Sequence, residues 1–457
     1  MNPSHNTSHA KAQRRKAKVL VVPLLIMFVV PTTWAQDVAD TIRVRTRVVF
    51  MDALVKDKKT GIPISDLKPE NFELFDDGKP RTVSYFTRDG QARKPLAIVM
   101  ILDLRDDGAG RFLKRDEVRK AIVEELGKLP LGDEAAILAI NMNSVDDKPA
   151  AIRNGKAMWL TDFTRDAAQF EAALARVPAL VAPAPESEKP DPSKHDEASP
   201  TRESSGSLSI TTDPKPADPA ADKAKEKDTL ETETIKGKNG AVITRTIKKD
   251  GSVNVRRESR DGKMVVQFDN IYDMAGATRD ATHLVADKRP NSQAAIIWLS
   301  DGIAPIFYED RDATEQILIR QNAIFNTLTV DMRTLYKFLL PFGQPLIGWT
   351  GISLAGSARR LAHNSGGEAV HVGRVRDYGA GLAKIFGNLT ARYSLGFALA
   401  EDEKDDGRMH ELGLRVKALD AKGKVRKLEV SSRRGYFMPK TDADQAAATT
   451  SSASPIK

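Results

Sequence analysis

Carboxylate side chains follow two apolar runs of this sequence, and they are the residues that could do chemistry. Asp103, Asp106 and Asp107 come directly after the run at 95–102, with Arg105 among them. Asp301 follows a second run at 294–299. Clustered carboxylate oxygens suit hard divalent cations such as Mg²⁺, Mn²⁺ or Ca²⁺, and carboxylates can also act as general acid and base.

The two apolar runs predict the elements that would position these residues. Each is continuous and rich in β-branched residues, which is typical of a strand covered on both faces of a parallel sheet. Sites in such sheets lie beyond the carboxyl ends of the strands, so we expect both acidic turns to share one edge. Helical patterns at 112–129, 313–326, 352–362 and 377–390 alternate with further strands, one of them at 369–372, which gives an α/β class.

The boundaries follow from changes in pattern along the chain. Alternating β patterns at 41–91 and 391–438 predict a flanking β domain in which the C-terminal strands complete the N-terminal ones. The α/β pattern occupies 94–180 and 269–390. Between these two parts, 181–228 is rich in Pro, Ala, Ser and charged residues, which predicts a disordered insert. The tail at 439–457 has the same prediction.

A β-meander is expected at 229–268, because three turn dipeptides, Asn239-Gly240, Asp250-Gly251 and Asp261-Gly262, separate alternating segments. Its arginines Arg256, Arg257 and Arg260 could form a basic patch, although a solvated hairpin face is the simpler interpretation.

The N-terminus is typical of a secretory signal peptide over 1–35, with five cations, a short apolar run and Ala35 before Gln36. Cleavage there removes those cations and no acid, so the formal net charge falls from +8 to +3. We therefore expect a periplasmic or secreted protein with no membrane span after cleavage and no nucleic-acid partner. The chain has no cysteine, which excludes disulfides and thiolate chemistry.

The order of several short segments resembles a known family. They are residues 98–103 (IVMILD) and 299–302 (LSDG), preceded by 71–80 (NFELFDDGKP) and followed by 393–397 (YSLGF) and 433–437 (RRGYF). Together they resemble the exported bacterial VWFA-related domain proteins. The resemblance implies a Rossmann-like von Willebrand factor type A domain, flanked here by a β-sandwich, that binds other macromolecules, in many members through a metal-ion-dependent adhesion site.

The resemblance also implies a ligand set, from which this sequence departs. Asp103 matches the first ligand and Asp301 the aspartate of the third loop. The two serine positions hold Arg105 and Asp107, and the threonine position holds Asp269. In one interpretation Asp103, Asp107, Asp269 and Asp301 form a carboxylate cage for Mg²⁺, Mn²⁺ or Ca²⁺.

In the other interpretation Arg105 pairs with Asp103 and Asp301 and replaces the cation. A guanidinium about 5 Å from a dication costs roughly 6 kcal/mol at an effective dielectric near 20, which would offset much of what the extra carboxylates gain. In both cases the partner-binding residues are expected at this edge: Asp103, Arg105, Asp106, Asp107 and Asp301.

Three functional classes follow from these features. The first is an exported, non-enzymatic, adhesion-type protein that binds a protein or cell-envelope partner through a degenerate adhesion site. The second is a structural envelope scaffold whose edge is inert. The third is a hydrolase that uses Asp103 and Asp301 as acid and base, although no nucleophile or substrate pocket is evident in the sequence.

Overall fold

A six-stranded sheet forms the centre of the computed structural model, which describes residues 47–88, 93–105, 108–140, 157–181, 208–214, 228–249, 251–269, 271–330, 348–400, 402–403 and 405–438. Its strands, in sheet order, are β17 (Ala369–Val372), β15 (Ile324–Val330), β13 (Gln293–Ser300), β5 (Leu96–Asp103), β6 (Glu134–Ile140) and β7 (Ala157–Thr164). All neighbours are parallel except β6 and β7. Counted along the chain, the order is 3-2-1-4-5-6, that of doubly wound α/β sheets.

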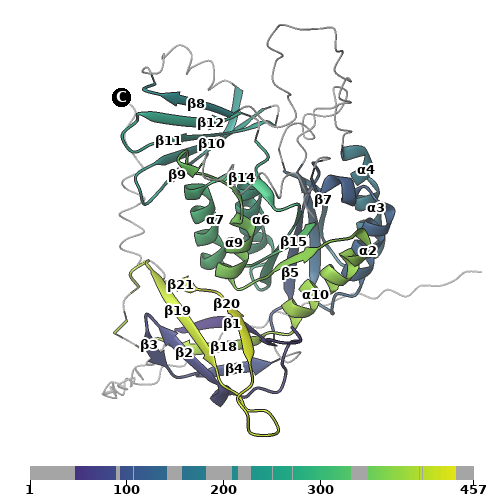
Figure 1. Ribbon diagram of the computed structural model, residues 1–457, viewed down its shortest axis with the longest axis vertical. Coiled ribbons are helices and arrows are strands. Elements are labelled where there is room, and N and C mark those ends of the chain that lie inside the picture. The colour runs from purple at the N-terminus through teal and green to yellow at the C-terminus, as the bar shows by residue number, and fades with distance from the viewer. Residues whose placement is uncertain are drawn as a thin grey trace, which may run out of the picture. The chain divides into compact units, whose positions relative to one another are not determined.

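Helices cover both faces of this central sheet (Figure 1). One face packs against α2 (Asp116–Gly127), α3 (Ala167–Ala175) and α10 (Tyr378–Thr390), and the other against α6 (Met274–Lys288), α7 (Tyr308–Arg320) and α9 (Ser357–Ser365). Short helices α1 (Gly110–Leu113) and α4 (Val177–Leu180) adjoin the first face. Because both faces are covered, every residue of β5 and β13 is buried, as their continuous apolar runs predict.

Two four-stranded sheets, here called the β unit, share one hydrophobic core. Their strands are β20 (Leu428–Ser432), β1 (Val48–Asp57), β18 (Tyr393–Ala398) and β4 (Tyr85–Arg88) in one sheet, and β21 (Gly435–Phe437), β19 (Met409–Val416), β2 (Phe72–Asp76) and β3 (Lys79–Arg81) in the other. A short 3₁₀ turn, η1 (Pro69–Asn71), precedes β2. The first strand β1 lies between β18 and β20, so segments from the two ends of the described chain form one unit.

A five-stranded sheet, here called the inserted sheet, has the order β8-β12-β11-β10-β9. Its strands are β8 (Leu208–Thr212), β9 (Thr229–Lys236), β10 (Val242–Lys248), β11 (Val253–Glu258) and β12 (Met264–Phe268). Gly240, Gly251 and Gly262 adopt the positive φ angles that these tight turns require. Strand β8 lies inside the range 181–228, where the composition predicts disorder; pairing with β12 supplies the order that the segment's own residues cannot.

Buried arginines attach the inserted sheet to the helices. Arg257 donates to Glu309 at the start of α7, from Nη2 to Oε1 at 2.9 Å, and only 8% of Arg257 is exposed. The expectation of a solvated face is therefore wrong for Arg257, whereas the side chain of Arg256 is 43% exposed. Arg245 pairs with Asp273 at the start of α6. The meander is thus held by long-range ion pairs that its own sequence does not reveal.

The segment after Asp301 is also held by the inserted sheet. Strand β14 (Ile303–Phe307) pairs with β16 (Ile352–Ala355), and Phe307 and Ile352 enter the core of the inserted sheet. The helix expected at 352–362 is therefore wrong over its first residues, which form β16, and α9 begins only at Ser357. Pairing with β14 prevails over local helical periodicity there.

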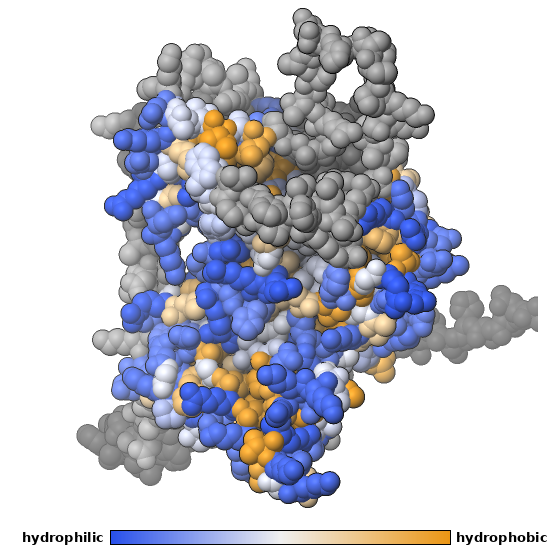
Figure 2. Space-filling view, in the orientation of Figure 1, coloured by the Kyte–Doolittle hydropathy of each residue, from blue (hydrophilic) through white to orange (hydrophobic). Residues whose placement is uncertain are grey.

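The surface is mainly hydrophilic on the face shown in Figure 2, with separate apolar patches over the inserted sheet and the β unit. Among the described residues, no helix is both long and apolar enough to cross a membrane. The expected signal peptide, most of the expected disordered insert, and the C-terminal tail lie outside the described residues, as do Asp106 and Asp107.

Candidate functional site

The two acidic strand ends lie side by side in the central sheet. Strands β5 and β13 are parallel neighbours, and Leu102 is paired with Leu299, so Asp103 and Asp301 leave the sheet at the same edge. This is the switch point of the strand order, where binding sites of doubly wound sheets lie. Asp103 is fully buried and Asp301 is 8% exposed.

Arg105 joins these two carboxylates. Its Nη2 lies 2.7 Å from Asp103 Oδ2 and 2.8 Å from Asp301 Oδ1. The same nitrogen donates to the carbonyl oxygen of Ile303 at 2.7 Å, and Nε donates to Asp103 Oδ1 at 3.1 Å. The hydroxyl of Ser300 donates to Asp103 Oδ2 at 3.0 Å. The Arg105 guanidinium therefore lies where the two carboxylates and the Ile303 carbonyl converge.

The surroundings keep Arg105 charged. Burial alone would lower the pKa of Arg105, but the negative charges of Asp103 and Asp301 outweigh it and raise the pKa well above its ordinary value. The Tyr272 ring lies 4.7 Å from the guanidinium carbon, in a cation–π arrangement. Burial and the charge of Asp103 raise the pKa of Tyr272, so its hydroxyl stays protonated. The cluster is a fixed arrangement of charges at neutral pH.

A glycine permits this close arrangement. A Cβ added to Gly108 would lie 2.9 Å from Asp301 Oδ2 and 3.4 Å from Arg105 Nη2. The turn after β5 therefore packs against the ion pair itself, where a larger residue would push the carboxylate away.

The remaining predicted ligands are placed differently. Asp269 lies just after β12 and accepts a hydrogen bond from Gln267 Nε2 at 2.6 Å. Asp107, like Asp106, is outside the described residues. Among the residues that the structure does describe, Asp103, Asp269 and Asp301 do not converge as a three-ligand metal group.

A divalent cation does not fit the site in this arrangement. An ion bound to both Asp103 and Asp301 would have to occupy the position held by Arg105 Nη2, which already contacts both carboxylates and the Ile303 carbonyl. Close approach of a dication to a guanidinium is strongly repulsive. In the structure Arg105 contacts both carboxylates, which is the arrangement that the second interpretation expects. The four-carboxylate cage stays a prediction.

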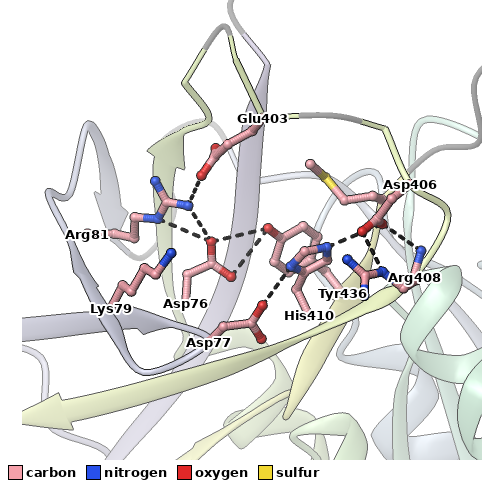
Figure 3. A pocket seen from close by; sticks show the side chains of 10 residues that line it. Asp76, Asp77, Lys79, Arg81, Glu403, Asp406, Arg408, His410 and Tyr436 are labelled. Atoms are coloured by element: carbon pink, nitrogen blue, oxygen red, sulfur yellow. Dashed lines mark hydrogen bonds and ion pairs between the residues drawn. The ribbon is translucent and has the colours of Figure 1, made fainter.

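A second charged cluster lies in the β unit and was missed by sequence reasoning (Figure 3). It lines a pocket of about 270 Å³. His410 on β19 is held between two carboxylates, with Nδ1 2.9 Å from Asp77 Oδ2 and Nε2 3.4 Å from Asp406 Oδ1. The sequence treats Asp76 and Asp77 as a hairpin turn, and no short spacing connects them to a histidine more than 300 positions later.

Internal pairing satisfies most of the charge in this second cluster. Asp76 accepts from Arg81 Nη2 at 2.7 Å, and Arg81 also pairs with Glu403. Arg408 Nε lies 2.7 Å from Asp406 Oδ2. Asp76, Asp77 and His410 lie close enough together to share a metal ion, but Arg81 on the buried carboxylate opposes one. The ion pairs of this cluster hold the β2–β3 turn against β19.

Comparison with known proteins gives matches among solved structures, at low identity and low TM-scores. No family model and no curated protein matches the sequence. Among solved structures, the chain is similar to the SpRpn10 VWA domain, at 10% identity and a TM-score of 0.28, covering 63% of this chain and 94% of that one. It is also similar to the pilus adhesin SpaC from Lactobacillus rhamnosus GG in its open conformation, at 8% identity and a TM-score of 0.32, covering 81% of this chain and 48% of the adhesin. The chain thus spans about half the length of that adhesin.

Proposed function

We propose that this protein is an exported, non-enzymatic binding protein that recognises a protein or cell-envelope partner at the edge carrying Asp103, Arg105 and Asp301. The location supports this proposal, because charged side chains are gathered at the switch point of a doubly wound sheet.

The observation that carries the proposal is the position of Arg105. In a type A adhesion site a metal ion completes its coordination with an acidic group of the partner. Here Arg105 contacts both carboxylates in the place that such an ion would take, so binding does not require a metal ion. The edge recognises its partner through fixed charges and through hydrogen bonds to the surrounding backbone.

The sign of the charge at this edge indicates the chemistry of the partner. Asp103 and Asp301 against Arg105 leave one net negative charge, and Asp106 and Asp107 follow Arg105 in the sequence. Opposite potentials across an interface favour association. The partner is therefore expected to present lysine or arginine side chains, the opposite of the acidic group that a metal-dependent site captures.

Acid–base catalysis is disfavoured by the same contacts. Asp103 is fully buried, and both Asp103 and Asp301 already accept hydrogen bonds from the Arg105 guanidinium, so neither is placed to exchange a proton with a substrate. The scaffold alternative, in which the edge binds nothing, differs from the proposal in one testable way: changes at the edge would leave partner capture unaffected.

The test is capture of partners from an envelope extract by wild-type protein, Asp301→Asn and a matched control, Glu124→Gln. The control Glu124→Gln also removes one negative charge, but Glu124 lies on α2 with its side chain 69% exposed. We expect wild type and Glu124→Gln to retain a partner in EDTA and Asp301→Asn to lose it, with recovery falling as salt rises.

Two outcomes would contradict the proposal. Release of the partner by EDTA from the wild-type protein would show that a metal ion participates in binding. That result would support the interpretation of the site as a carboxylate cage. Equal capture by Asp301→Asn and wild type would show that the edge is not the binding surface, as the scaffold alternative expects.

A further inference from the structure

A pocket of about 180 Å³ lies where the β unit meets the central sheet. It is at the edge opposite the acidic site, because Leu96 and Ile324 are the first residues of β5 and β15. Its apolar wall comes from strands of both units and from the end of α10: Phe50, Tyr85, Leu96, Ile324 and Leu389. Phe50 and Tyr85 pack edge to face with their centroids 5.0 Å apart, and Phe50 is 45% exposed.

Arg392 is the charged residue in this wall that lacks a full set of acceptors. It lines the pocket and is 9% exposed. Its Nη2 donates to the Gly366 carbonyl at 2.8 Å, whereas Nε and Nη1 have no hydrogen-bond partner among the described residues. A guanidinium carries five N–H donors, and leaving such donors unpaired in the interior is costly.

The carboxylates around Arg392 are already engaged elsewhere. Asp52, which also lines the pocket, accepts from the Ser394 hydroxyl at 2.5 Å, and Glu368 pairs with Lys56 and Asn388. Burial lowers the pKa of Arg392, and the distant charges of Asp52 and Glu368 oppose that shift only in part. The region therefore holds a buried cation whose charge is incompletely balanced.

A second arginine, the half-buried Arg433, increases this imbalance. Arg433 donates to the carbonyls of Ile319 and Phe50 and to no carboxylate among the described residues, and desolvation lowers its pKa to about 10. The charge of Asp52 acts on both Arg392 and Arg433. Lys94 adds a further positive charge to the pocket lining. An anion in the pocket would restore the balance.

We propose that this pocket binds a small monocarboxylate with an apolar body, whose carboxylate is attracted by the incompletely balanced charge of Arg392 while its body lies against Phe50, Tyr85 and Leu96. The size fits, because an apolar cavity of about 150 Å³ holds one benzene molecule. Acids with roughly six or seven carbons, such as benzoate or hexanoate, match a pocket of about 180 Å³. The site is independent of the function proposed for the acidic edge.

The composition of the lining favours a monocarboxylate over phosphate. Arg392 is a more weakly hydrated cation than an ammonium group, and it pairs well with a carboxylate. Asp52 in the same lining would repel a dianion more strongly than a monoanion. The apolar wall would gain nothing from a phosphate, whereas it gains from covering a ring or a short alkyl chain.

The test is calorimetric titration of the purified full chain with benzoate, hexanoate, benzamide and inorganic phosphate. We expect both carboxylates to bind at one site, with benzamide and phosphate weaker by roughly tenfold or more, since each loses either the charge or the apolar contact. This comparison uses wild-type protein, so it does not depend on whether a variant folds. Absence of carboxylate binding, or equal binding of benzamide, would overturn the proposal.

Variants then locate the site. Arg392→Gln is expected to weaken benzoate binding roughly tenfold or more, and Arg392→Lys by less, because it keeps the charge but not the guanidinium. The matched control is Arg376→Gln, which removes an arginine whose side chain is 71% exposed outside the pocket, and which should bind like wild type. Unchanged binding by a folded Arg392→Gln would overturn the assignment.

Discussion

Arg105 and Arg392 are both withdrawn from solvent, yet their surroundings have opposite effects. Arg105 meets two carboxylates, a carbonyl oxygen and an aromatic face, and its pKa is raised. Arg392 meets one carbonyl oxygen, and its pKa is lowered. Burial disfavours the charge in both, so the difference comes from the acceptors nearby.

The two sites differ in whether the protein places carboxylates close to the buried arginine. At the acidic edge the protein supplies both the cation and two close carboxylates, so the buried guanidinium needs no external anion. At the junction of the β unit and the central sheet the protein supplies a buried cation without a close counterion, and an external anion can complete it. The three predictions below test whether this distinction holds.

The largest effect is expected from Arg105→Met. Removing one partner of a buried ion pair leaves Asp103 and Asp301 facing each other without compensation, which costs about 3–5 kcal/mol of unfolding free energy. Urea unfolding would measure the loss. Arg376→Met, at an exposed position, is the control and should change stability by less than about 0.5 kcal/mol.

The same variant tests the replacement of a metal by Arg105. With the guanidinium gone, Mg²⁺ or Ca²⁺ should recover part of the lost stability, while the wild-type protein should show no such stabilisation. A variant as stable as wild type in the absence of metal would show that Arg105 does not balance these carboxylates.

An intermediate effect is expected from Asp273→Asn, which removes one of the three carboxylates around Arg245 and leaves Asp280 and Glu233. Burial alone would raise the pKa of Asp273, but Arg245, Arg279 and the Gly276 N–H outweigh it, and the pKa is lowered. The substitution should cost about 2–3 kcal/mol at neutral pH. Asparagine can still accept from the Gly276 N–H, now 2.8 Å from Asp273 Oδ1, so the helix cap is retained.

The pH dependence of this loss has a definite sign. Since the folded-state pKa of Asp273 lies below its ordinary value of 3.8, the stabilisation is fully present above pH about 3.8 and is lost as pH falls through the folded-state pKa. The stability difference between wild type and Asp273→Asn should therefore shrink in acid. A difference that stayed constant between pH 6 and pH 3 would contradict this account.

The smallest effect is expected from Arg392→Met. Replacing an incompletely paired buried charge by an apolar side chain of similar length is often neutral or stabilising, so we expect a change within about 1 kcal/mol of wild type. Thermal and urea unfolding without added carboxylate would measure it. A loss as large as that of Arg105→Met would erase the distinction between the two sites.

The sequence was sufficient for the elements that bury continuous apolar runs. Strands β5 and β13 follow from runs with no polar interruption, and the strand at 369–372 forms with the expected bounds. Segments with balanced local preferences were placed less well. The helix expected at 313–326 begins at Tyr308 and ends at Arg320, and the residues after it form β15, because pairing with β13 decides where the strand starts.

The candidate site could be predicted only in part. The sequence indicates that Asp103 and Asp301 share an edge, but it left open whether Arg105 faces them or turns outward, since that depends on side-chain geometry. The burial of Arg245, Arg257 and Arg392 could not be predicted at all. From sequence alone an arginine is expected to be exposed to solvent unless its partner is known. The partners of these three arginines lie between 26 and 52 positions away along the chain.

The position of β1 has a consequence for the order in which the chain can fold. Val48 pairs with Ala398, and Val55 pairs with Val430, so the β unit needs contacts across almost the entire described chain. Such non-local pairings are slow to form, whereas most strand and helix contacts of the central sheet are closer in sequence. The central sheet can therefore form before the C-terminal strands have paired with β1. The pocket beside Arg392 forms only when that pairing is complete.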